Sequence, residues 1–240
     1  MSRKGDYGFD APYILIIFAC GVVGSIALLV LGTVLSNPWL TSFSAWGIAI
    51  DAICGLSFLY ATRVGKHVVW GRLVDELALH GDETVVDVGC GRGAVLLLAA
   101  ARLPRGKAIG IDIWSAMDQS GNAEAVTRRN AELEGVVERI ELVTADMRAI
   151  PLPDGSADVI VSSLAIHNIS SAAERAKALA EILRVLRPGG RFTIVDIQHA
   201  RSYVSELERL GATVIRRGLG PRLWFGGPFV AASAVIGTKP

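Results

Sequence analysis

The sequence of 240 residues predicts an α/β fold, in which a mostly parallel sheet covered by helices follows an N-terminal hairpin of two apolar helices. Three observations support this prediction. No charged residue or histidine occurs in residues 11–50. From residue 84 onward, short apolar runs alternate with stretches of helical spacing, which is typical of a parallel sheet. A glycine-rich loop over residues 87–94, DVGCGRGA, joins the first run to the first helical stretch.

The N-terminal region contains two apolar segments. The first covers residues 13–35 and exceeds the roughly 20 residues that a membrane-spanning helix needs. Asn37-Pro38 is a turn signal, and the second segment covers residues 39–61. Asp51 stands near the middle of the second segment, where a charge costs about 3 kcal/mol on insertion scales. The second segment therefore either spans the bilayer with Asp51 paired or protonated, or lies in the interface.

Flanking positive charge predicts the orientation of this hairpin. Arg3 and Lys4 precede the first segment, basic residues follow the second from Arg63 onward, and the connecting loop has none. Cytosolic flanks carry an excess of Lys and Arg. We therefore expect a multi-pass membrane protein whose soluble domain faces the cytosol. The expected division is a membrane segment at 1–62 and a soluble domain at 63–240, since the composition changes there.

The soluble part begins with an amphipathic helix over residues 63–81. A buried strand is expected over 84–89, because a short apolar run ends at glycine. A helix over 93–103 follows the loop, and the apolar run at 107–113 predicts the second strand. The next stretch of helical spacing covers 122–134.

Two strands, over 212–217 and 229–239, end the chain. Their connection is too short for a crossover helix, so they should pair antiparallel. In the other strands, regular alternation with helices places the ligand beyond the carboxyl ends of the sheet, near the first strand. The remaining expected elements are strands at 139–146, 157–166 and 191–197 and helices at 172–186 and 201–210, the former helix stopped by Pro188-Gly189-Gly190.

Composition excludes several classes of partner. The net charge of +1 gives no field that would steer the chain to nucleic acid. The three cysteines, Cys20, Cys54 and Cys90, show no pairing pattern, which favours a reducing compartment. The four histidines are dispersed without the spacing of metal ligands. We therefore expect no metal site and no nucleic-acid partner.

The glycine loop indicates the kind of ligand. Gly89, Gly91 and Gly93 let the backbone turn sharply and approach a ligand at a helix N-terminus. Asp112 ends the second strand, where a carboxylate can accept from both hydroxyls of a ribose. Asp87 would repel a pyrophosphate but attract an ammonium group. An amino-acid end, a ribose and a base together describe S-adenosylmethionine.

Residues 68–240 resemble the class I S-adenosylmethionine-dependent methyltransferases, especially those similar to ubiquinone/menaquinone C-methyltransferases. The stretches that carry the resemblance are VVDVGCGRG, IGIDI, VTADMRAIPLPDGSADVIVSSLAIHNI and EILRVLRPGGRFTIVDI. It implies a Rossmann-like class I methyltransferase sheet, mostly parallel with the last strand antiparallel, and S-adenosylmethionine as cofactor.

The resemblance also implies roles for single residues. Asp87 and the backbone of Gly89 and Gly91 are expected to hold the methionine part of the cofactor. Asp112 is expected to hold the ribose. The other implied contacts are Ile113 and Met147 beside the adenine, Asp146 accepting from the adenine amino group, and Leu164 closing the pocket from the fourth strand. The segment 114–122 either lines the pocket or is only a capped loop.

His167 follows the fourth strand and is the one candidate base. A neutral imidazole suits deprotonation of a phenol, enol or thiol. Alternatively, His167 and Asn168 only hydrogen-bond the loop and cap the next helix. The fourth strand ends in SSLA rather than in the Asn/Asp-Pro-Pro-aromatic motif used on nucleobases or glutamine. The acceptor is therefore not expected to be an amino group of that kind.

These observations predict a membrane-anchored methyltransferase, an enzyme whose acceptor is small and hydrophobic, such as a quinone precursor, a lipid or a phenol. The apolar loop at 218–229 either touches the membrane, closes over the acceptor, or is only a packed hairpin connection. Two alternatives remain. One is a membrane adaptor that keeps the fold without turnover, and the other is a nucleotide-dependent oxidoreductase.

Overall fold

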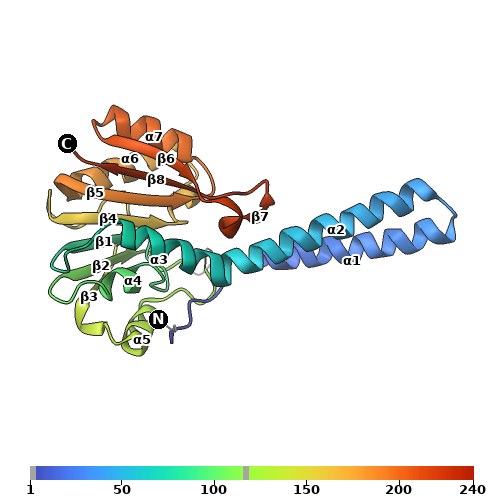
Figure 1. Cartoon of the computed structure of the whole chain (residues 1–240), viewed down its shortest axis with the longest axis horizontal. Helices are drawn as coiled ribbons and strands as arrows, with labels where there is room; N and C mark the ends of the chain where they lie inside the picture. The colour runs from blue at the N-terminus through green and yellow to red at the C-terminus, as the bar shows by residue number, and fades with distance from the viewer. Residues whose placement is uncertain (1–3, 116–118) are drawn as a thin grey trace.

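The computed structural model describes residues 4–115 and 119–240 (Figure 1). A seven-stranded sheet with helices on both faces carries a long helical hairpin that projects from one end. Arg3, one of the basic residues that flank the first apolar segment, lies outside the described residues, as do residues 116–118 of the segment 114–122.

The two apolar segments form the antiparallel helices of the hairpin, α1 (Tyr13–Val34) and α2 (Pro38–Tyr60). Asn37 sets the turn between them, because its side chain accepts from the Leu40 N–H at 3.1 Å and caps α2. The expected helices are thus confirmed. Both are long and apolar enough to cross a membrane, by length and composition only.

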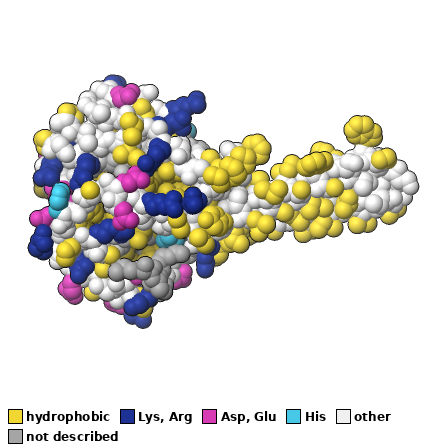
Figure 2. Space-filling model, in the orientation of Figure 1, with side chains coloured by type: hydrophobic (Ala, Val, Ile, Leu, Met, Phe, Trp, Pro, Cys, Tyr) yellow, Lys and Arg dark blue, Asp and Glu magenta, His cyan; other side chains and the backbone are white. Residues whose placement is uncertain are grey.

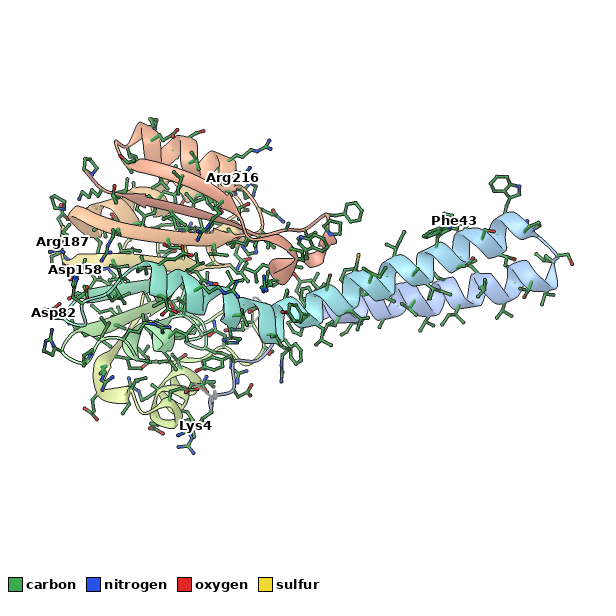
Figure 3. All side chains as sticks on the ribbon, viewed as in Figure 1. Lys4, Phe43, Asp82, Asp158, Arg187 and Arg216 are labelled. Atoms are coloured by element: carbon green, nitrogen blue, oxygen red, sulfur yellow. The ribbon has the colours of Figure 1, made fainter. Side chains whose placement is uncertain are left out.

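Small residues let the two helices of the hairpin pack closely. A Cβ at Gly32 would lie 2.8 Å from the Thr41 nitrogen, and Gly21 faces the carboxylate of Asp51. The outward faces carry exposed apolar side chains, among them Phe43 (Figure 3). Figure 2 shows apolar side chains along the hairpin, whereas Lys, Arg, Asp and Glu gather on the part of the molecule that contains the sheet.

The second hairpin helix continues beyond its apolar segment. A π-helical turn, η1 (Ala61–Gly65), leads into α3 (Lys66–Glu76), and the three form one helix of 39 residues. No proline interrupts this stretch, so nothing removes its backbone hydrogen bonds. The expected boundary at residues 62 and 63 falls inside this helix, which joins the hairpin directly to the sheet.

The sheet has the strand order β3-β2-β1-β4-β5-β8-β6. The first five strands in this order are parallel, whereas β8 is antiparallel to both of its neighbours. The expected antiparallel pairing of the last two strands is confirmed. The bounds are β1 (Thr84–Val88), β2 (Lys107–Asp112), β3 (Ile140–Thr144), β4 (Ala157–Ser163), β5 (Leu186–Asp196), β6 (Thr213–Gly218) and β8 (Ser233–Thr238).

Two strand predictions differ most from the structure in their boundaries. β5 begins at Leu186, before the Pro-Gly-Gly stop, because Leu186 pairs with Ala157 and the extra residues of β5 lie at a register shift before the Val159–Arg191 pair. The run expected at 229–239 is divided. Its first part belongs to a small hairpin whose first strand is β7 (Phe225–Pro228), closed by a bridge between Trp224 and Ala231.

Helices cover both faces of the sheet. On one face, α3 and the short α4 (Leu96–Ala100) pack with α5 (Glu124–Glu134). On the other face, α6 (Ala172–Val185) and α7 (Ala200–Arg209) pack together. The two cores follow from β1, where Val85 and Val86 point to opposite faces. The 3₁₀ turns are η2 (Val137–Arg139), η3 (Ile166–Asn168) and η4 (Gly220–Leu223).

Trp70 of α3 connects the long helix to the sheet. It is 0% exposed, and its indole Nε1 donates to Ser163 Oγ at 2.8 Å. We expect Trp70→Ala to lower the free energy of unfolding by about 3–5 kcal/mol, since it leaves a cavity and an unpaired hydroxyl. Urea unfolding in detergent measures this. Trp39→Ala is the matched control, because Trp39 is 87% exposed on the hairpin. Equal losses in both variants would contradict the prediction.

Candidate functional site

A cavity of about 870 Å³ lies where β1, β2 and β4 end, as expected for a parallel sheet. Asp87 and the glycine loop form its centre. Its wall continues to the base of the hairpin, where Phe18 of α1 and Phe58 of α2 face it together with Phe225. Residues far apart in the sequence therefore share one cavity.

The glycine loop has the backbone conformation that the sequence predicts. Gly89, Gly91 and Gly93 have φ values of +76°, +51° and +85°, which only glycine adopts readily. A Cβ at Gly91 would lie 2.5 Å from Gln119 Oε1. Gly89 and Gly91 line the cavity, whereas Gly93 lies behind it, packed against Thr127. The first two glycines are thus at the cavity, and the third shapes the turn.

Asp87 is the least satisfied polar group of the site. It is 1% exposed, and neither carboxylate oxygen has a hydrogen-bond partner among the described residues. Burial raises the pKa of Asp87 to about 8, and the neighbouring Asp112 acts in the same direction, while the backbone N–H of Leu96 and the charge of Lys66 oppose the shift. An isolated buried carboxylate is costly. The site thus fits a ligand with a positive charge, such as the ammonium group of an amino acid.

Asp112 ends β2 beside the same loop. Its carboxylate accepts from the N–H groups of Gly91 at 2.8 Å and Trp114 at 2.6 Å. Asn122 donates to it at 3.3 Å. Asp112 therefore orders the glycine loop in addition to lining the cavity. Gln119 and Asn122 of the segment 114–122 also line the cavity, so this segment contributes to its wall.

The outer end of the cavity is polar. Asp146 binds Arg148 through Nε at 2.9 Å and Nη2 at 2.5 Å, and Arg148 also pairs with Glu174 at 3.0 Å. Hydrogen bonds from Arg148 lower the pKa of Asp146. Sequence analysis did not predict Arg148 or Glu174. Any donor that approaches Asp146 shares this carboxylate with Arg148. Ile113 and Met147 line the same end of the cavity.

Leu164 lies at the exit of β4 in a left-handed conformation, with φ +55°. Such a conformation costs a non-glycine residue about 1 kcal/mol or more. The Leu164 N–H donates to the Val195 carbonyl at 2.8 Å, and this bond holds the turn in place. The turn directs Leu164, Ala165 and His167 toward the cavity, which all three line.

His167 is paired with a buried acid. Its Nδ1 lies 2.5 Å from Oδ1 of Asp196, and its backbone N–H donates to Oδ2 at 3.0 Å. Tyr203 donates its hydroxyl to the same Oδ2 at 3.2 Å, and burial raises the pKa of this tyrosine. Asp196 is fully buried. The backbone hydrogen bond from His167 to Asp196 fixes the loop. Nδ1 lies within ion-pair distance of Asp196 but has no hydrogen bond among the described residues, so the interpretation of His167 as a base rests on this proximity.

Asp196 and Tyr203 were not predicted from the sequence. The position of Asp196 at the end of the fifth strand could have indicated that it belongs to the site, because the carboxyl ends of neighbouring parallel strands meet at one edge. Tyr203 gave no comparable signal, since a tyrosine on the buried face of a helix is ordinarily a core residue.

An N-terminal strap, residues 4–12, crosses the site before α1 begins. Asp10 accepts from the buried Lys66 at 2.7 Å, and both line the cavity. Asp6 binds Arg92 of the glycine loop at 2.8 Å. From the sequence, Lys66 was interpreted as one of the basic residues that follow the second apolar segment. The structure places it in a buried ion pair. The strap thereby ties the start of α1 to the glycine loop.

Residues 86–194 match the family described as "Methyltransferase domain". This stretch is less than half of the chain, and it is similar to methyltransferases that depend on S-adenosylmethionine. It is similar to a ubiquinone/menaquinone biosynthesis C-methyltransferase of Dinoroseobacter shibae, at 33% identity over 55% of this chain and 50% of the relative. It is also similar to a demethylmenaquinone methyltransferase of Thermus thermophilus, at 32% identity over 55% of this chain and 56% of the relative.

The fold of the methyltransferase domain also matches solved structures. An S-adenosylmethionine-dependent methyltransferase from Aquifex aeolicus aligns with a TM-score of 0.58 and 21% identity, covering 71% of this chain and 89% of that one. This likeness confirms the Rossmann-like methyltransferase sheet. The chain spans about half the length of the curated relatives that it matches.

S-Adenosylmethionine is the cofactor of such a domain, and the residues present fit it. The unpaired carboxylate of Asp87 matches a cationic amino-acid end, and the bare backbone of Gly89 and Gly91 leaves room for close approach. Among residues 4–115 and 119–240, no group of three His, Cys, Asp or Glu side chains could hold a metal ion.

Proposed function

We propose that this protein is a membrane-anchored S-adenosylmethionine-dependent methyltransferase that acts on a small hydrophobic acceptor. The observation that carries the proposal is the single cavity that joins Asp87 to an apolar wall made by Phe18, Phe58 and Phe225. One end of this cavity suits a charged cofactor and the other an apolar acceptor. The relatives named for ubiquinone and menaquinone synthesis support a quinone precursor as the acceptor.

Membrane anchoring is supported by the surface of the hairpin. Its outward side chains are apolar and exposed, and no charged residue other than Asp51 occurs in either long segment. Asp51 is half-buried and faces Gly21 of α1. Lys4 and Arg63 flank the hairpin on one side, which favours the cytosol for the methyltransferase domain.

In the proposed complex, Asp87 holds the ammonium group and Asp112 the ribose. The backbone of Gly89 and Gly91 follows the methionine part, and Leu164 closes the pocket. The contacts proposed for the adenine are Ile113, Met147 and Asp146, the last in competition with Arg148. When bound, the cofactor supplies the methyl group and the leaving group of an in-line displacement.

The chain's own contribution to chemistry is alignment and proton transfer. His167 accepts a proton from the acceptor hydroxyl or from the carbon to be methylated through Nε2, because Nδ1 faces Asp196. Asp196 holds the ring orientation and stabilises the imidazolium that forms. Tyr203 fixes Asp196 in turn. The apolar walls exclude water from the reacting atoms.

Asp112→Ala is expected to weaken the binding of S-adenosylhomocysteine by about 2 kcal/mol or more, roughly 30-fold. The variant loses the ribose contacts and also the acceptor that orders the Gly91 N–H. Calorimetric titration measures the effect. Asp82→Ala is the control, because Asp82 is exposed at the end of the sheet opposite the hairpin (Figure 3). If Asp112→Ala binds S-adenosylhomocysteine with unchanged affinity, Asp112 does not contact the cofactor.

The proposal as a whole is tested by methyl incorporation. Purified protein in vesicles made from a bacterial lipid extract is given S-adenosylmethionine labelled in its methyl group. Label in the organic extract is expected, and an Asp87→Asn control should give none. If folded wild-type protein binds the cofactor but labels no extractable product, a hydrophobic acceptor is ruled out for this lipid extract and the adaptor hypothesis gains support.

A further inference from the structure

We infer that the acceptor enters sideways from the lipid, through a portal between the base of the hairpin and the loop at residues 225–231, here called the portal loop. The substrate class that follows is a membrane-dissolved molecule with an apolar chain. Its reactive head lies at His167 while its chain remains in the bilayer. This inference rests on the proposed function and adds the route and the shape of the substrate.

The portal loop docks on the apolar part of α2. Gly227 donates its N–H to Ser57 Oγ at 2.8 Å, and Phe225 packs edge-on against Phe58 with ring centroids 6.0 Å apart. A Cβ at Gly227 would lie 3.3 Å from Cys54 Sγ. Cys54 is about 13 Å along the helix from Arg63, at 1.5 Å per residue. The portal loop therefore reaches the depth of the apolar segment.

The exposed side of the portal loop has the character of a membrane contact. Phe229 at its tip is 84% exposed, and Ile53 and Leu56 of the adjoining α2 surface are also exposed. No charged residue occurs in residues 223–238. Figure 1 shows the loop projecting from the sheet toward the hairpin. A large exposed apolar side chain beside an apolar helix fits a lipid environment better than water.

The portal loop and the hairpin contribute mainly apolar side chains to the cavity wall. Ile14, Phe18, Phe58, Phe225 and Val230 line it near the hairpin. Gly226 also lines it, and a Cβ there would lie 3.1 Å from Val230 Cγ2. A larger side chain at Gly226 would therefore fill the space between Val230 and Phe18.

The exposed ion-pair group of Asp146, Arg148 and Glu174, on segments other than the portal loop and the hairpin, also lines the cavity. The N-terminal strap closes part of the remaining wall with Asp10 and Ala11. A polar cofactor thus has a polar entrance, and an apolar acceptor has an entrance of its own beside the lipid-facing helices.

The membrane contact is tested by photo-crosslinking. A benzophenone amino acid replaces Phe229 in the full chain, reconstituted in vesicles of phosphatidylethanolamine and phosphatidylglycerol. Illumination is expected to give covalent phospholipid adducts, detected by intact-protein mass spectrometry. The matched control places the same amino acid at Ile215, which is 61% exposed on the edge strand β6. Adducts at 229 and none at 215 support the portal, whereas no adduct at 229 overturns it, whether or not the protein turns over.

The passage itself is tested by Gly226→Leu, with Gly218→Leu as the control because a Cβ at Gly218 meets nothing within 4 Å. We expect methyl incorporation into lipid extract to fall at least tenfold in Gly226→Leu, while affinity for S-adenosylhomocysteine stays unchanged. Val230→Trp replaces this variant if it does not fold. Wild-type incorporation in a folded portal variant would overturn the inference. Loss of cofactor binding in the wild type would instead overturn the proposed function.

Discussion

Asp87→Asn is expected to weaken S-adenosylhomocysteine binding at least about 100-fold, the largest effect of any single substitution in the cofactor site. The wild-type carboxylate is buried without a side-chain hydrogen-bond partner among the described residues, and Lys66, the cation that acts on it, is already paired with Asp10, so a ligand ammonium group gives Asp87 a charge partner of its own. An amide of the same size cannot form that ion pair. Loss of one partner of a buried pair costs about 3 kcal/mol or more. Titration calorimetry measures the affinity, and an undiminished value would contradict the role of Asp87.

Asp87 should also release a measurable proton when S-adenosylhomocysteine binds to the wild-type protein. Burial raises the pKa of Asp87 to about 8, so at pH 7 the free protein holds this carboxyl protonated. An ammonium group beside it lowers the pKa again, and binding should release close to one proton. Titrations at pH 7 in two buffers of different ionisation enthalpy count this proton. Proton release should decrease above about pH 8 and should be absent in Asp87→Asn. Equal proton release by the wild type and the variant would show that the proton comes from another group.

His167→Ala is expected to lower kcat by about 10²–10⁴-fold, the usual contribution of a general base, with little change in cofactor affinity. The reason is geometric, since Nδ1 of His167 faces the buried Asp196 and the opposite nitrogen is left for the acceptor. Turnover is followed by methyl incorporation and cofactor affinity by calorimetry.

Asp196→Asn distinguishes the two interpretations of His167. If Asp196 acts through the imidazole, this variant lowers kcat and moves the pH dependence of kcat, because the imidazolium loses its partner. If the contact only holds the loop, the variant lowers stability and leaves the pH profile in place. Tyr203→Phe is the milder control, since it removes a single hydrogen bond to Asp196. If folded His167→Ala turns over at the wild-type rate, His167 has only a structural role.

The sheet was predictable because its central strands are buried on both faces and their sequences are therefore continuously apolar. Asp87 and Asp112 were predictable for a related reason, since each polar residue stands at the end of such a run, where strand ends meet. The start of β5 could not be predicted, because the pairing of Leu186 with Ala157 overrides a local Pro-Gly-Gly signal. Local sequence predicts elements better than it predicts their ends.

The contacts that complete the site were less accessible to sequence reasoning. Lys66 meets Asp10 across 56 residues, and neither position has a local pattern that selects the other. The portal loop meets α2 across 170 residues through the Gly227–Ser57 hydrogen bond. Partners at such separations are chosen by the packing of the whole chain. The sequence did show that the loop is apolar and rich in glycine, which left membrane contact, closure over the acceptor and simple packing as alternatives.

The most direct test of the account is calorimetric titration of the detergent-solubilised full chain with S-adenosylhomocysteine, with NADH as the comparison ligand. The buried Asp87 predicts micromolar binding of S-adenosylhomocysteine and none of NADH, because a pyrophosphate cannot form the ion pair that an ammonium group forms with this side chain. Binding of NADH would favour an oxidoreductase. No binding of S-adenosylhomocysteine by protein that circular dichroism shows to be folded would contradict the central claim and favour an adaptor that keeps the fold without turnover.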